Sequence, residues 1–271
     1  MSREAETGRV ALVTGAARGI GAATVRALCD RGYNVVAVDC CAGTSTNDLP
    51  GVGYALADKD ALEALRAEHP DQVVALVTDV RDRAALDRAA VTALDRFGRL
   101  DAAVAAAGVI AGGLAMWETP PSHVRTLWDV DVMGVWNTAA VTVPRMLGGP
   151  DPGGCRFVAV ASAAGYRGLF HLAGYGMTKH AVIGLVRGLA ADLTGTGVSA
   201  VAVSPGSTDT AMLSATAALY GLDDAEAFAS SQQLGRLIQP AEVAEVIAFC
   251  CSRAGEIMTG SVISAEGGFR G

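Results

Sequence analysis

The segment TGAARGIG (residues 14–21) lies between a short apolar run, RVALVT (9–14), and a helical pattern, IGAATVRALCDRG (20–32). Its three glycines permit a tight turn, and they let the backbone come close to a pyrophosphate at the N-terminus of the following helix. A glycine triplet alone is weak evidence. With a strand before it and a helix after it, the segment predicts the first turn of a dinucleotide-binding fold.

The rest of the chain alternates apolar runs of strand length with helical patterns such as RAALDRAAVTALDRFG (83–98). The further expected strands are NVVAVD (34–39), VVALVTDV (73–80), LDAAVAAAG (100–108), CRFVAVAS (155–162), VSAVAVS (198–204) and SVISAEGG (261–268). Their continuous hydrophobicity is typical of strands covered on both faces. We therefore expect one α/β domain over residues 1–271, a Rossmann fold whose doubly wound parallel sheet has about seven strands with helices on both faces.

The composition argues against several classes of function. The chain has 271 residues, is 51% hydrophobic and has a net charge of −7, which disfavours nucleic acid and anionic membranes as partners. Its six cysteines have no metal-ligand spacing, and no apolar run is long and continuous enough to cross a bilayer. We expect a cytoplasmic protein with reduced thiols, no metal site and no membrane insertion.

One connection is longer than a crossover helix requires. Residues 40–72 begin with a turn-rich stretch and then offer a helix from Asp58, as its N-cap, to about His69, before Pro70. A decorated surface loop is one interpretation, since insertions are well tolerated there. The other is a flap, because the segment leaves the sheet beside the expected nucleotide site.

The residue at the end of the second strand favours one cofactor. Asp39 can accept hydrogen bonds from both ribose hydroxyls of NAD, and it would repel the additional phosphate of NADP. Arg18 complicates this choice, because a basic residue near the adenosine can serve a phosphate. The carboxylate lies closer to the 2′ position, so the sequence favours NAD.

The segment AGYGMTKHA (173–181) places Tyr175 and Lys179 four residues apart, on one face of a helix. A phenol with a pKa of about 10 is a poor base at neutral pH. A nearby ammonium and an oxidised nicotinamide would both stabilise the phenolate, so that Tyr175 could act as acid and base. Ser162 ends the fifth strand, where open α/β sheets place their active sites, and can bind the substrate oxygen.

Together TGAARGIG, Ser162, the Tyr175–Lys179 pair and PGSTDT (205–210) resemble the short-chain dehydrogenase/reductase family over nearly the whole chain. The resemblance implies that Lys179 also binds the nicotinamide ribose, that Asp79 and Val80 hold adenine, and that Gly108 lies against the adenosine ribose. It also suggests a homotetramer. The predicted cofactor-binding residues are Gly15, Arg18, Gly19, Ile20, Gly21, Asp39, Asp79, Val80, Ala107, Gly108, Tyr175, Lys179, Pro205, Thr208, Thr210 and Met212.

A closer resemblance is to the mycofactocin-coupled branch of the family. It rests on the insertion at 40–72 and on DAAVAAAGVIAGG (101–113), FVAVASAAGYRGL (157–169) and AVSPGSTDTAMLSATAALYGLDD (202–224). Members of this branch are thought to hold NAD so firmly that it does not exchange, and mycofactocin reoxidises it in place. The insertion would then be the flap that traps the nucleotide.

The chain departs from the family pattern at two places. Where the family often has Asn-Asn-Ala-Gly after the fourth strand, this chain has Ala105-Ala106-Ala107-Gly108, which removes an amide that steadies the turn. Asp131 stands where most relatives place an asparagine that holds a relay water near the lysine. As an anion it would favour the charged form of Lys179. We expect an altered but working proton relay, with Asp131 as the fourth residue of the catalytic set.

The segment 207–237 follows the last cofactor motif and has an apolar side, so we interpret it as a substrate lid. Trp117, Phe170 and Tyr220 could line an apolar pocket beneath it, or belong to the core. His171 and His180 have neither a paired acid nor a nucleophile elbow, so hydrolysis is disfavoured. A lipophilic alcohol or its ketone is the expected substrate.

Three functions remain open on the sequence. The first is an NAD-dependent alcohol dehydrogenase with captive cofactor. The second is a ketone or 3-oxoacyl reductase that exchanges NAD(P)H freely. The third is a redox sensor that binds the dinucleotide without catalysis, which Asp131 and the alanine run favour and the intact Ser162, Tyr175 and Lys179 oppose.

Overall fold

The computed structural model describes residues 8–270, and these form a sheet of seven parallel strands in the order β3-β2-β1-β4-β5-β6-β7. The expected fold class is confirmed. The strands are β1 (Val10–Thr14), β2 (Asn34–Asp39), β3 (Val73–Val77), β4 (Ala102–Ala105), β5 (Arg156–Val160), β6 (Ser199–Pro205) and β7 (Val262–Ala265). The order reverses between β1 and β4, so a topological switch point lies there.

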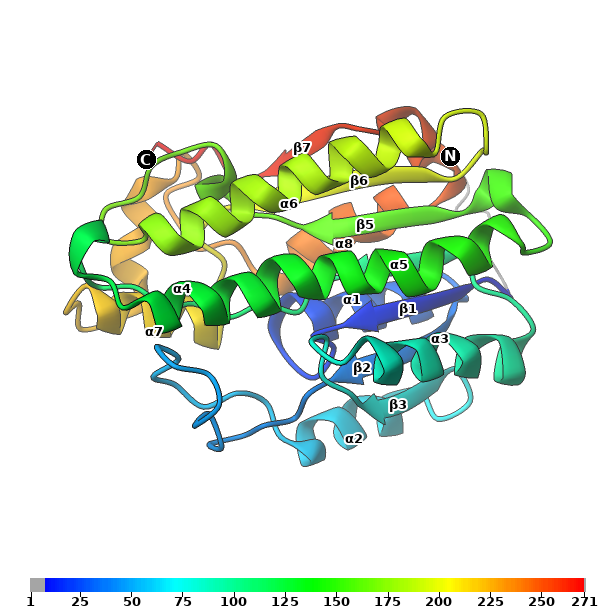
Figure 1. Cartoon of the computed structure of the whole chain (residues 1–271), viewed down its shortest axis with the longest axis horizontal. Helices are drawn as coiled ribbons and strands as arrows, with labels where there is room; N and C mark the ends of the chain where they lie inside the picture. Colours follow the sequence, from blue (N-terminus) through cyan, green and yellow to red (C-terminus); the bar gives the residue numbers. More distant parts are fainter. Residues whose placement is uncertain (1–7, 271) are drawn as a thin grey trace.

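Helices cover both faces of the sheet (Figure 1). One layer contains α3 (Arg83–Phe97), α5 (Met133–Leu147) and α6 (Ala173–Asp192), and the other contains α1 (Gly19–Cys29), α2 (Lys59–Glu68) and α8 (Pro240–Cys251). Successive residues of a strand serve opposite cores: Leu12 packs in the first and Val13 in the second. This division explains why the strands are apolar throughout.

Three strands end three residues earlier than the sequence predicts, and each has a local reason. β3 ends at Val77, where the chain turns toward the cavity at Thr78. β4 ends at Ala105, because the amides of Ala106 and Ala107 leave the sheet and donate to Thr14 Oγ1 at 3.2 and 3.3 Å. β7 ends at Ala265, before two glycines of positive φ that cannot continue a strand.

The helix ends follow the sequence signals closely. Asp58 caps α2 by accepting from the Ala61 amide at 2.9 Å, and the helix ends before Pro70, as predicted. Gly98 caps α3 with a φ of 78°, which also confirms the prediction. The first helix is shorter than 20–32, because it ends at Cys29 and the chain turns before Gly32.

The carboxyl ends of the strands face two segments without long helices (Figure 1). One is the first part of the insertion, residues 40–58, which precedes α2. The other contains α7 (Ala211–Leu219) and a 3₁₀ helix at Ala225–Ser231. Between α4 (Pro121–Leu127) and α5 the chain forms a π-helical stretch at Trp128–Val132. No helix within residues 8–270 is long and apolar enough to span a membrane.

Two alanine substitutions should differ in their effect on the free energy of unfolding. Gly21 has no room for a Cβ, whereas Gly98 has room but a left-handed backbone. At Gly21 an added Cβ would lie 1.9 Å from the Gly15 carbonyl oxygen, so Gly21→Ala must displace the first turn. At Gly98 a Cβ would meet nothing within 4 Å, so Gly98→Ala should cost only the left-handed backbone penalty of about 1 to 2 kcal/mol. Urea unfolding measures both, and equal losses would contradict the packing argument.

Candidate active site

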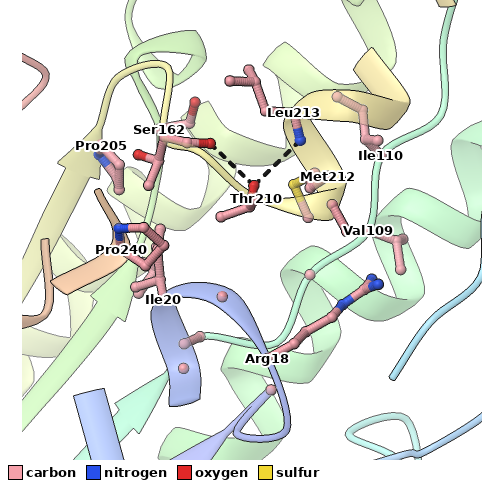
Figure 2. A pocket seen from close by; sticks show the side chains of 18 of the residues that line it. Arg18, Ile20, Val109, Ile110, Ser162, Pro205, Thr210, Met212, Leu213 and Pro240 are labelled. Atoms are coloured by element: carbon pink, nitrogen blue, oxygen red, sulfur yellow. Dashed lines mark hydrogen bonds between the residues drawn. The ribbon is translucent and has the colours of Figure 1, made fainter. Parts of the chain in front are cut away.

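A large cavity of about 1040 Å³ lies at the carboxyl edge of the sheet. It is lined by all sixteen predicted cofactor-binding residues and by Ser162. Figure 2 shows Arg18, Ser162 and Thr210 around this space, although they come from three distant segments.

Thr210 is the N-cap of α7, since its hydroxyl accepts from the Leu213 amide at 3.3 Å. The same hydroxyl donates to the Thr208 carbonyl at 3.2 Å. Asp131 is the one predicted site residue outside the lining.

The glycine turn packs against the chain that follows β4. Gly15 and Gly19 have positive φ values of 67° and 53°. A Cβ on Gly15 would lie 2.7 Å from the Cα of Ala107, so only glycine allows this approach. Thr14, which sequence reasoning missed, holds the second segment by accepting from its two alanine amides. A hydroxyl from β1 therefore steadies the turn that the missing asparagine amide was expected to weaken.

Asp39 lies at the end of β2 and is held by two amides. Its Oδ2 accepts from Ala17 N at 3.1 Å, and its Oδ1 accepts from Cys41 N at 3.0 Å. A carboxylate has about four acceptor sites, so both oxygens can still accept from ribose hydroxyls. The side chain is therefore oriented for that contact before any ligand binds.

Arg18 is directed toward the insertion. Its Nη1 donates to the Ala55 carbonyl at 2.8 Å, and its guanidinium lies 5.3 Å from the ring centroid of Tyr54. A second arginine ties the insertion to the adenine side, because Arg81 bridges Asp79 at 2.7 Å and Asp48 at 2.6 Å. Sequence reasoning did not anticipate Tyr54 or Arg81.

Tyr175 and Lys179 are buried together on α6. The Lys179 ammonium lies 5.5 Å from the centroid of the Tyr175 ring and donates to the Val160 carbonyl at 3.3 Å. Burial raises the pKa of the phenol; Lys179 and a hydrogen bond with Ser162 lower it, and Asp131 raises it further. Lys179 lowers the pKa as predicted, but burial outweighs it, so the net direction is upward in the protein without a nucleotide.

Asp131 is completely buried in the π-helical stretch beneath the cavity wall. Its Oδ1 accepts from Val109 N at 2.8 Å, while Oδ2 has no hydrogen-bond partner. A Cβ on Gly108 would meet this Oδ1 at 3.3 Å and the Lys179 ammonium at 3.5 Å, so both groups lie behind the same glycine. Burial raises the pKa of Asp131 to about 6, although Lys179, the Val109 amide and Thr178 each lower it.

The other end of the cavity is apolar. Phe170 and Tyr220 contribute to its lining, and Tyr220 donates to the Phe170 carbonyl at 2.5 Å, which connects α7 with the segment before α6. His171, His180 and Trp117 do not line it, and the Trp117 side chain is 83% exposed. Other large apolar side chains in the lining include Leu169, Leu172, Met212, Leu213, Phe228 and Phe269.

These features fit a dinucleotide. The cavity combines a glycine turn at a helix N-terminus, an oriented carboxylate at the end of β2, and a Ser–Tyr–Lys set beside an apolar recess. The volume exceeds that of a typical small-ligand pocket, which leaves room for a cofactor and a substrate together. Among residues 8–270, no three His, Cys, Asp or Glu side chains are grouped to hold a metal ion.

Comparison with known proteins agrees with this geometry. The chain matches the family described as Enoyl-(Acyl carrier protein) reductase over residues 15–270. It is 34% identical to the cis-4-hydroxycyclohexanecarboxylate dehydrogenase of Sinomonas cyclohexanicum, over 98% of each chain. It is also 34% identical to the (-)-trans-carveol dehydrogenase of Rhodococcus erythropolis, over 76% of this chain and 73% of that one. A crystal structure of carveol dehydrogenase from Mycobacterium avium in complex with NAD matches with a TM-score of 0.89 and 26% identity, covering 97% of this chain and 98% of that chain.

Two substitutions should move the pKa of Tyr175 in opposite directions. Lys179→Met removes a cation that lowers this pKa, so the value should rise. Asp131→Asn removes a carboxylate that raises it and that is ionised where phenols titrate, so the value should fall. NMR of tyrosine labelled with carbon-13 at Cζ measures both, with Tyr175→Phe to assign the signal.

Tyr220 is the internal control for this titration, because burial alone raises its pKa and neither substitution changes that burial. Shifts of the same sign in both variants would contradict the electrostatic assignment.

Proposed function

The chain belongs to the short-chain dehydrogenase/reductase family of oxidoreductases, and from that premise we propose that it oxidises a lipophilic alcohol with NAD as hydride acceptor. The observation that carries the proposal is the cavity that Ser162, Tyr175 and Lys179 share with the predicted nucleotide-binding residues. Proton-transfer groups and a dinucleotide cradle open to the same space, as hydride transfer from an alcohol requires.

The roles of the three side chains follow from their positions. Ser162 is proposed to bind the substrate hydroxyl, and Tyr175 removes its proton as the carbon–hydrogen bond breaks. Lys179 stabilises the phenolate form of Tyr175 that accepts this proton, with its charge held in place by burial and by the Val160 carbonyl. When bound, oxidised NAD supplies the acceptor for the hydride and a positive charge near the phenol. That charge opposes the effect of burial on the phenol's pKa.

NAD is favoured over NADP by the charges around the adenosine. Asp39 is fixed at the end of β2, where a 2′-phosphate would meet its carboxylate. The insertion engages Arg18 through the Ala55 carbonyl and the Tyr54 ring, which reduces its availability to a phosphate. The NAD complex of the related carveol dehydrogenase supports the same choice.

We propose a cyclic alcohol without a charged group as the substrate. The relatives named above act, by their names, on carveol and on a hydroxycyclohexanecarboxylate. The basic residues that line the cavity, Arg18, Arg26, Arg81 and Lys179, lie outside the segments 169–172, 212–220 and 228 that supply most of its large apolar side chains. An uncharged ring alcohol therefore suits this recess better than the acid does.

The finer proposal is that NAD does not exchange and that mycofactocin, an external carrier, reoxidises it in place. Support comes from the resemblance of residues 40–72, 101–113, 157–169 and 202–224 to that branch, and from the many contacts that hold the insertion beside the cavity. On the family resemblance alone we also propose a cytoplasmic homotetramer.

A freely exchanging reductase is the second candidate, and the description of the matched family favours it. Nucleotide retention separates the two. We expect purified protein to release NAD only on denaturation, and to oxidise alcohol only with an external electron acceptor present. Turnover that needs added NAD(P), from protein purified without nucleotide, would establish the exchanging enzyme instead.

Tyr175→Phe tests catalysis against a sensor function. The variant lacks the hydroxyl that moves the proton, so turnover of cyclic alcohols with an external electron acceptor should fall roughly 10²- to 10⁴-fold, while NAD still binds. Both are measured on one preparation, by alcohol oxidation and by the nucleotide recovered after denaturation. Unchanged turnover would remove Tyr175 from the mechanism, and absence of turnover in the parent protein would favour the sensor.

A further inference from the structure

The first part of the insertion is built into the body of the protein. Leu49 and Val52 are 4% and 5% exposed, and both belong to the core that covers the α5 face of the sheet. Gly51 has a φ of 88°, and a Cβ there would lie 2.6 Å from the ring of His123 and 3.0 Å from Ala111. The segment therefore crosses from the nucleotide side to α4 and to the chain after β4.

Tyr54 links this part of the insertion to the chain after β4 by a hydrogen bond. Its hydroxyl accepts from the Ile110 amide at 3.2 Å, and its ring lies under the Arg18 guanidinium, whose Nη1 binds the next carbonyl, that of Ala55. One side chain of the insertion thus contacts both the glycine turn and the segment that follows β4.

The amide that Tyr54 holds is adjacent to the amide that Asp131 holds. Asp131 Oδ1 accepts from Val109 N, and Tyr54 Oη accepts from Ile110 N. Residues 106–110 all line the cavity, so these two bonds fix its wall from two sides. One comes from the core beneath the wall and the other from the insertion.

The phenol of Tyr54 stays neutral throughout the physiological range. Its pKa is raised to about 12, with burial the largest cause; the Ile110 amide and Arg18 lower it, and Asp131 and Tyr175 raise it. A neutral hydroxyl keeps the same hydrogen bond from pH 6 to pH 9.

We infer that Tyr54 is a positioning residue for the bound nucleotide: its hydroxyl fastens the insertion to the Ile110 amide, and that bond must break before the dinucleotide can leave. The inference rests on the proposed function only in taking the ligand to be NAD. It assigns to one hydroxyl a role in nucleotide release that is separate from the chemistry at Tyr175.

Tyr54→Phe tests this inference, because it removes the hydroxyl and keeps the ring beneath Arg18. Holoprotein loaded with radiolabelled NAD is chased with unlabelled NAD, and the retained label is followed with time. Loss of one net hydrogen bond should speed release roughly threefold to tenfold. The factor should be the same at pH 6 and pH 9, because the Tyr54 hydroxyl stays neutral at both.

Tyr33→Phe is the matched control. Tyr33 is fully buried in the core on the opposite face of the sheet, and its hydroxyl donates to the Cys251 carbonyl at 3.0 Å. This variant should lose thermal stability without faster NAD release. Equal release rates in Tyr54→Phe and the parent would overturn the inference, as would equally accelerated release in Tyr33→Phe.

Hydrogen exchange gives a second readout that does not depend on the nucleotide. The Ile110 amide should exchange faster in Tyr54→Phe than in the parent, whereas the Val109 amide, held by Asp131, should change less. Unchanged protection at Ile110 would also overturn the inference.

These outcomes remain distinguishable from failure of the proposed function. If the parent protein exchanges NAD within seconds, captive cofactor is wrong, yet the ratio of release rates between the two proteins still measures the contribution of Tyr54. If no alcohol is oxidised, the release and exchange measurements are unaffected.

Discussion

The site depends on the contact between the glycine turn after β1 and the chain that leaves β4. These strands are neighbours at the point where the strand order reverses, so their carboxyl ends diverge around one opening. The two segments lie so close together at Gly15 that no residue with a Cβ would fit there. The Thr14 hydroxyl links them by accepting hydrogen bonds from the Ala106 and Ala107 amides. This tight junction brings the wall of residues 106–110 against the turn, so the residues predicted to bind the nucleotide and those predicted to be catalytic line one cavity.

The strand sequence, the single domain and the glycine turn could be predicted from the sequence, because each depends on periodicity or on local backbone chemistry. The N-cap Asp58 and the C-cap Gly98 could also be predicted, since each depends on local backbone chemistry. Thr14, Tyr54 and Arg81 could not be found this way. Their partners lie 92, 56 and 33 positions away along the chain, and no local pattern encodes such pairings.

The pKa of Tyr175 shows where reasoning from neighbouring charges is incomplete. The spacing to Lys179 correctly indicated a cation within range of the phenol. Spacing carries no information on burial, however, and burial disfavours the charged form of any group. In this site it outweighs the cation, so the protein by itself holds the phenol in its neutral form. That Ser162, Tyr175 and Lys179 lie at one cavity could thus be predicted from the sequence, whereas the loss of hydration that governs the phenol's pKa could not.

Burial also determines the pKa of Asp131, and the hydrogen bond of this side chain does not explain why it is a carboxylate. An asparagine could accept from Val109 N equally well through its own side-chain oxygen, so that bond does not explain a carboxylate. The raised pKa means that the folded protein binds the proton more tightly than the unfolded chain. The contribution of Asp131 to the free energy of unfolding therefore falls as the pH rises from about 4 to about 6, and above that its charged form costs stability. What the carboxylate adds in return is a negative charge beside Lys179 and Tyr175, with one oxygen free of protein donors. Because packing does not account for a buried charge in this position, we propose that the Asp131 carboxylate takes part in proton transfer.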